Sequence, residues 1–341
     1  MLATEKYSKD SCGVKPRDRT KLVSSVGITF GVLAVIAFCL RITSRFTRSG
    51  GSFGMDDYTM ILAVCLVIPL SALSVPLAVH GLGRDIWNVS FDDIGYISYI
   101  FFWDELIYLG SLPIIKISIL LFYLRIFPRQ GFKYCVYALI AANIGYLISF
   151  EVISIWQCRP LDAAWKRWDG TYPSKCNNIN LQSWLSATFN IILDLFMFIL
   201  PLPELYKLSM SPKKKFHIML MFSVGLFVTI VSCLRLKFLV QFGNTTNLTQ
   251  DYTNIGVWST IEVPMGIICA CMPAIRSLFR NIFPTVFSST TKDASAASSM
   301  PKGSRVTNSS IARQLSSKPK HNDEESFVQL VEMDSRGESR V

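Results

Sequence analysis

The stretch ISYIFFWDELIYLGSLPIIKISILLFYLRIF, residues 97–127, decides the fold of this chain. It is long enough to cross the hydrocarbon core of a bilayer, because a helix needs about 20 apolar residues to do so. Yet it contains Asp104, Glu105 and Lys116. A charged side chain at that depth costs at least about 2.5 kcal/mol when it faces lipid. These three side chains must therefore face protein, water or a ligand, and we expect other membrane helices around them.

The composition supports a membrane protein. The chain has 341 residues, of which 50% are hydrophobic and 17% charged, whereas soluble domains carry about 25% charged residues. The net charge of +10 does not indicate a nucleic-acid partner, because the basic residues gather at the ends of apolar runs. That pattern is typical of membrane helices anchored on their cytoplasmic side.

Seven apolar runs have the length of a membrane span. We predict an all-α membrane protein, a bundle of seven transmembrane helices followed by a disordered, Ser- and Thr-rich C-terminal tail. The predicted spans are 22–40, 58–80, 97–126, 135–156, 181–205, 217–240 and 256–279. The predicted regions are an N-terminal segment (1–21), a membrane domain (22–282) and the tail (283–341).

The loop charges predict the orientation. Basic residues dominate the connections after the first, third and fifth spans, which the positive-inside rule assigns to the cytoplasm. They are Arg41, Arg45, Arg48, Arg125, Arg129, Lys133, Lys207, Lys213, Lys214 and Lys215. The N-terminal segment is also basic and opposes this assignment, but two features of the other side favour it. That side carries one cysteine pair suited to a disulfide, Cys158 and Cys176, and glycosylation sequons at Asn88, Asn244 and Asn247. We therefore expect a plasma-membrane protein with its N-terminus outside and its tail in the cytoplasm.

The polar residues inside the spans fall into two predicted layers. The outer layer contains Asp104, Glu105, Glu151, Arg235, Lys237 and Glu262, and we predict a ligand pocket there formed by the four acids, Arg235 and Trp258. The inner layer holds Lys116, Asn190 and Asp194, and depth along the spans makes Asp194 the best partner for Lys116. Structural roles stay open for both layers, because a buried Lys–Asp pair also fixes helix register and tryptophans gather at every membrane interface.

Several kinds of chemistry have no basis in this sequence. The three histidines, His80, His217 and His321, are far apart, so no metal cluster or catalytic triad is expected. No lysine occurs between Lys237 and Lys292, so the last span has no residue for a retinal Schiff base, and we expect no cofactor. The absence of a catalytic constellation favours a non-enzymatic protein over an enzyme.

The order of motifs resembles the fungal rhodopsin-domain family of integral membrane proteins, the satratoxin-cluster type, which is related to fungal chemoreceptor-like seven-helix proteins. The matching pieces are Asp56-Asp57-Tyr58, GLGRDIW (81–87), KISILLFYLRIF (116–127), FEVISIWQCRPLDAAW (150–165) with Cys176, Asn190, Asp194, Pro201, Pro203, KKKF (213–216), Gly225, Arg235, Trp258, Glu262 and MPAIRSLF (272–279). The resemblance covers roughly residues 22–282 and implies seven helices, but it implies no defined biochemical activity.

Three functions fit these features. The first is a receptor-like sensor that binds a small molecule in the outer polar pocket and engages a cytoplasmic signalling partner, with tail residues Ser288 to Thr291 as phosphorylation sites. The second is an accessory protein or enzyme of secondary-metabolite biosynthesis, which the family resemblance implies. The third is a transporter, which intramembrane charges also fit, although we find no repeat between the two halves of the chain.

Overall fold

The computed structural model describes most of the predicted membrane domain. The described residues are 2–13, 17–47, 53–127, 129–207, 212–242 and 248–282. The predicted disordered tail, its phosphorylation cluster and the sequons at Asn244 and Asn247 lie outside these residues.

Seven long helices form the described part of the chain. Six of them are long and apolar enough to cross a membrane, and α9 is the seventh helix of the bundle, as predicted. They are α2 (Thr20–Phe46), α3 (Met55–Val79), α4 (Phe91–Ile126), α5 (Gln130–Ile155), α7 (Ile179–Ile199), α9 (Pro212–Phe242) and α10 (Leu248–Ile282). The short elements are α1 (Leu2–Ser11), η1 (Ile86–Asn88), β1 (Cys158–Arg159), α6 (Ala163–Lys166), η2 (Arg167–Asp169), β2 (Lys175–Cys176) and α8 (Leu202–Lys207).

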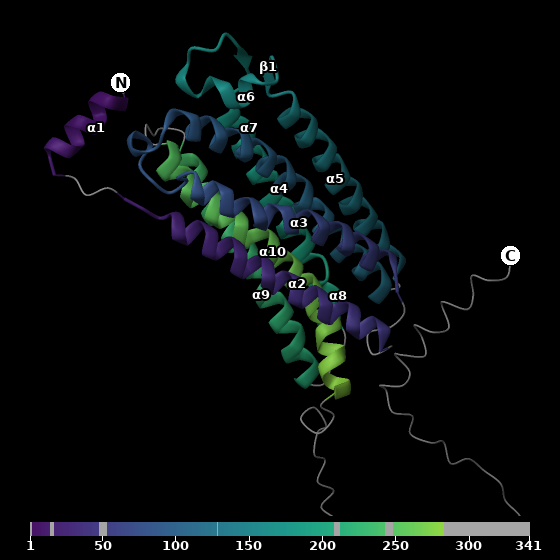
Figure 1. Ribbon diagram of the computed structural model, residues 1–341. Helices are drawn as coiled ribbons and strands as arrows, with labels where there is room; N and C mark the ends of the chain where they lie inside the picture. Colours follow the sequence, from purple (N-terminus) through teal and green to yellow (C-terminus); the bar gives the residue numbers. More distant parts are fainter. Residues whose placement is uncertain are drawn as a thin grey trace, which may run out of the picture. The chain divides into compact units, whose positions relative to one another are not determined.

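The long helices pack in a ring that follows the chain. Each packs on the next, and α10 closes the ring by packing along α2 (Figure 1). α4 also contacts α10 and α7, so this charged helix has neighbours on both sides of the bundle. This placement explains how it carries charges, because its polar residues meet other helices instead of lipid.

Small residues bring α2 and α3 close together. A side chain on Gly27 would overlap Ser74 of α3, and one on Gly31 would lie 2.6 Å from Ser71 Oγ. Such small-residue seams let membrane helices approach closely when no hydrophobic effect drives them together.

The observed helices extend beyond the predicted spans. α4 begins at Phe91 instead of residue 97, and α10 begins at Leu248 instead of 256, so the expected long connection 241–255 is largely helical. Hydrophobicity marks only the part of a helix inside the hydrocarbon, whereas the helical backbone continues into polar sequence. The chain breaks between α7 and α8 at Leu200 and Pro201, as expected for a proline, which has no backbone N–H to continue the helix.

The GLGRDIW motif joins three segments at the end of the bundle that we predict to be outside. The backbone N–H of Arg19 donates to the carbonyl of Gly83 (3.0 Å), and Thr249 Oγ1 donates to the carbonyl of Arg84 (2.7 Å). Gly83 has a φ of +108°, and a Cβ there would lie 2.9 Å from the backbone of Arg19. Glycine is therefore required where the N-terminal segment crosses this loop.

Candidate functional site: a polar core in the helix bundle

Lys116 of α4 is fully paired inside the bundle. Its ammonium donates to the backbone carbonyl of Asn190 (2.9 Å) and to Asn190 Oδ1 (2.6 Å), and lies 3.0 Å from Asp194 Oδ1. Asn190 and Asp194 are one turn apart on α7, so both face α4. The structure thus brings together the three residues of the predicted inner layer.

Glu262 of α10 is the hub of this core. It is 1% exposed and accepts hydrogen bonds from Tyr108 of α4 (2.6 Å), from Asn190 of α7 (3.0 Å) and from Ser232 of α9. The sequence placed Glu262 in the outer layer, but these contacts join it to the inner one. One carboxylate therefore connects four helices.

Arg235 of α9 lies beside this hub. Its guanidinium carbon is 4.1 Å from the centre of the Tyr108 ring, a cation–π contact, and its Nε donates to Ser259 Oγ (2.9 Å). Lys237, two residues further on, is exposed. Of Arg235 and Lys237, only Arg235 belongs to the polar core.

Three carboxylates of the predicted pocket differ from the paired core. Asp104 and Glu105 of α4 and Glu151 of α5 are partly buried, and none makes a hydrogen bond or ion pair within the described part of the chain. Glu151 reaches across Gly110 of α4, where a Cβ would lie 3.0 Å from its Oε1. Arg235 is the cation that acts electrostatically on Glu105. The bundle thus holds an acidic patch, Asp104, Glu105 and Glu151, with unused acceptors.

Aromatic side chains flank the polar core and the acidic patch. Trp258 of α10 stacks on Phe238 of α9, with ring centres 6.4 Å apart. Trp165 of α6 packs edge-on against Tyr99 of α4 at 5.2 Å. Large flat surfaces therefore lie one turn from Glu262 along α10 and within two turns of Asp104 along α4.

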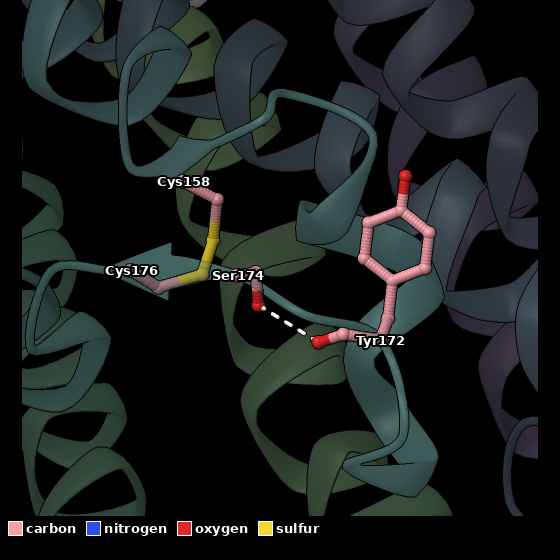
Figure 2. The surroundings of a disulfide bond; sticks show 4 residues. All are labelled: Cys158, Tyr172, Ser174 and Cys176. Carbon is pink, nitrogen blue, oxygen red and sulfur yellow. Dashed lines mark hydrogen bonds between the residues drawn. A yellow bond between two sulfur atoms is a disulfide. The ribbon is translucent and has the colours of Figure 1, made fainter.

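The loop between α5 and α7 is closed by the predicted disulfide. Figure 2 shows Cys158 bonded to Cys176 across the β1–β2 hairpin. Lys166 binds Asp162 at 2.8 Å, and the hydrogen bonds from Lys166 and Tyr172 hold the pKa of Asp162 below its ordinary value. The loop is thus a folded element.

A buried charge cluster that was not predicted from the sequence lies at the opposite end of the bundle. Arg41 and Arg45 were counted as loop residues, but both lie in α2 and are buried. Arg41 binds Asp57 (2.9 Å) and Asp56 (2.6 Å), and Arg45 binds Asp56 (2.8 Å). Arg125 lies 3.6 Å from Asp56. The sequence does contain the pattern that indicates this cluster. Asp56 and Asp57 are adjacent at the start of α3, and Arg41 and Arg45 lie one turn apart near the end of α2.

That cluster also fastens α10. Arg41 Nη1 donates to the carbonyl of Ala270 (2.7 Å), and Ser44 Oγ donates to that of Ala274 (2.9 Å). These carbonyls flank Pro273, which has no N–H and so disrupts the hydrogen bonding of the helix around it. The charge cluster thus adds donors to carbonyls of α10 on either side of Pro273.

One sequon lies within the described residues. Asn88 is the last residue of η1 and is partly buried, and Ser90 of the same sequon is the N-cap of α4. Whether Asn88 carries a glycan stays a prediction. In the described residues no group of His, Cys, Asp and Glu side chains has the arrangement of a metal site.

The membrane-length helices and their polar core define a multi-pass helical membrane protein. Residues 40–281 match the fungal rhodopsin domain. The chain therefore belongs to the fungal rhodopsin domain family, the family indicated by its motifs.

Three relatives illustrate its neighbours. A SAT4 family membrane protein of Emericella nidulans is 31% identical over 207 residues, 60% of this chain and 52% of the relative. Receptor GIN3 of Arthrobotrys oligospora is 27% identical over 282 residues, 82% of this chain and 67% of the relative. Fugralins biosynthesis cluster protein 2 of Gibberella zeae is 26% identical over 205 residues, 57% of this chain and 49% of the relative. The chain thus spans about half the length of the first and third. No solved structure matches the chain.

Proposed function

We propose that this protein is a receptor-like sensor of the plasma membrane, and that its small-molecule ligand binds at the acidic patch of Asp104, Glu105 and Glu151. Its N-terminus lies outside, its tail meets a cytoplasmic signalling partner, and it carries no retinal, because α10 contains no lysine. The name of the relative called receptor GIN3 supports this proposal.

The observation that carries the proposal is the contrast between paired and unpaired acids. Glu262 and Asp194 have hydrogen-bonding partners from neighbouring helices, whereas the acidic patch has none in the described residues. Ionisable groups left without partners in a membrane are costly and mark functional sites. A ligand bound there lies about 16 Å along α4 from Lys116, at 1.5 Å per residue, and touches helices that the polar core ties together.

A ligand screen by thermal stability tests the proposal. Small molecules that raise the melting temperature of the purified protein are retested on Glu105→Gln, Glu151→Gln and the double variant. We expect the double variant to lose most of the stabilisation, since both acceptors are weakened while the shape of the pocket is kept. Asp92→Asn is the matched control, because Asp92 is an exposed carboxylate on the same helix. Equal stabilisation of all variants by every hit would overturn the proposed site.

A biosynthetic role is the second candidate. Fugralins biosynthesis cluster protein 2 is named for such a cluster, and half-buried acids are suited to donating a proton to an apolar substrate. Genes for synthases and oxidases beside the gene for this protein favour that role. A sensor needs no such neighbours.

A further inference from the structure

The disulfide hairpin presents a polar face toward the outer end of α5. Arg159 pairs with Lys175 in the β1–β2 register, and the N–H of Asn177 donates to the carbonyl of Gln157 (2.8 Å). Side chains alternate along a strand, so the residues on either side of the disulfide share one face. The members of this face are Gln157, Arg159, Lys175 and Asn177.

Two like charges stand directly opposite each other on this face. Arg159 and Lys175 are both exposed, and neither has an ion-pair partner among the residues that the structure describes. Like charges at directly opposed positions of a hairpin are destabilising. By contrast, Lys166 of the same loop does have an ion-pair partner, Asp162. An anion between Arg159 and Lys175 removes the repulsion.

A pocket lies where this face meets α5. It has a cavity volume of about 390 Å³, within the size range of small-molecule sites. Its apolar wall consists of Val152, Ile153 and Trp156 of α5 and its C-terminal cap. Trp156 is 64% exposed, as expected for a tryptophan at the boundary between lipid and water. One side of the pocket is therefore suited to acyl chains and the other to an anion.

Gln157 adds a specific polar contact. Gln157 lines the pocket and is 5% exposed, and its buried Oε1 has no hydrogen-bond donor in the described part of the chain. A buried acceptor without a partner is unfavourable, so a ligand that brings a donor relieves that cost. Hydroxyl-bearing head groups supply such a donor.

We propose that this pocket binds one anionic phospholipid with a hydroxyl-bearing head group. Its phosphate lies between Arg159 and Lys175, a hydroxyl donates to Gln157, and its acyl chains run along Val152 and Ile153. A lipid accounts for the exposed apolar wall, which a free phosphate leaves unused. The site is separate from the acidic patch, is opposite in charge, and does not depend on the proposed sensing function.

Native mass spectrometry of the purified full chain tests this assignment. The protein is mixed with equal amounts of phosphatidylglycerol and phosphatidylcholine of identical acyl chains, and the adducts are counted. We expect phosphatidylglycerol to be preferred, and R159Q/K175Q to reduce the preference by about 25-fold. The attraction of one basic residue to anionic lipids is worth about 1 kcal/mol, and 1.4 kcal/mol corresponds to tenfold in affinity. Each single variant should reduce the preference for phosphatidylglycerol about fivefold.

The controls separate lipid binding from general charge and from misfolding. R167Q removes a charge from the same loop outside the pocket and should keep the preference for phosphatidylglycerol. K175E supplies Arg159 with an ion-pair partner, so it should abolish that preference while the hairpin stays folded. Peptide mapping without reduction verifies the Cys158–Cys176 bond in each variant. Three results would overturn the proposal: no preference in the wild type, an equal loss in R167Q, or displacement of the lipid by millimolar inorganic phosphate.

Discussion

At the scale of single residues, Lys116 shows how the bundle accommodates a charge. An ammonium has three donors, and Lys116 has three acceptors within 3.0 Å: two oxygens of Asn190 and one of Asp194. Asn190 then donates its own amide to Glu262. The neutral Asn190 therefore links Glu262 to the cation, which Asp194 contacts directly.

Removing the cation alone should destabilise the protein strongly. Lys116→Met leaves Asp194 charged and Asn190 without its donor, and breaking one side of a buried ion pair costs about 3–5 kcal/mol. We expect the double variant Lys116→Met/Asp194→Leu to recover most of that loss, because an apolar pair needs no partner. Denaturation midpoints in detergent measure both effects. Lys237→Met, at an exposed site of α9, is the control, and an equally small change in both lysine variants would refute a stabilising role for the pair.

Part of this site was predictable from the sequence. The depth of Lys116 and the one-turn spacing of Asn190 and Asp194 predict a shared polar strip. The role of Glu262 as a hub was not predictable, since its donors include Tyr108 and Ser232, ordinary neutral residues on separate helices. Contacts between helices depend on the rotation of each helix about its axis. A single sequence specifies that rotation poorly for α4 and α5, because both are apolar on every side and do not separate a polar face from an apolar one.

At the scale of elements, the seam between α2 and α3 depends on the absence of side chains. Gly27 and Gly31 lie one turn apart and face Ser74 and Ser71. The seven helices themselves follow from apolar length. Their ends do not, since Arg41 and Arg45 continue α2 past the apolar run and are buried by pairing with the acids of α3.

Substituting alanine at two glycines should have opposite effects. Gly27→Ala places a Cβ against both Ser74 Oγ and Ser74 Cβ, so the helices must move apart, at about 1–3 kcal/mol. Gly145→Ala on α5 meets no atom within 4 Å and should stabilise the helix by up to about 1 kcal/mol, because alanine favours helix more than glycine does. Melting temperatures in detergent show whether each substitution raises or lowers the stability. A Gly27→Ala protein as stable as Gly145→Ala would exclude a close seam.

At the scale of the whole molecule, the buried charge cluster changes the argument for orientation. Arg41, Arg45 and Arg125 lie against Asp56 and Asp57, so three arginines counted toward a positive cytoplasmic side are largely neutralised. The orientation then depends more on Lys213, Lys214 and Lys215 at the start of α9 and on the disulfide at the opposite end. A disulfide persists only in an oxidising compartment, and so it favours placing the hairpin outside.

Glycosylation and protease mapping in intact fungal cells test that orientation. Asn88, Asn244 and Asn247 are changed to Gln one at a time, and an epitope is added after Val341. We expect a shift in electrophoretic mobility for at least one sequon variant, and an epitope that external protease digests only after the membrane is opened. An epitope digested in intact cells would invert the bundle. The acidic patch and the disulfide hairpin would then face the cytosol, where external molecules do not reach them. The biosynthetic role would then become the better account.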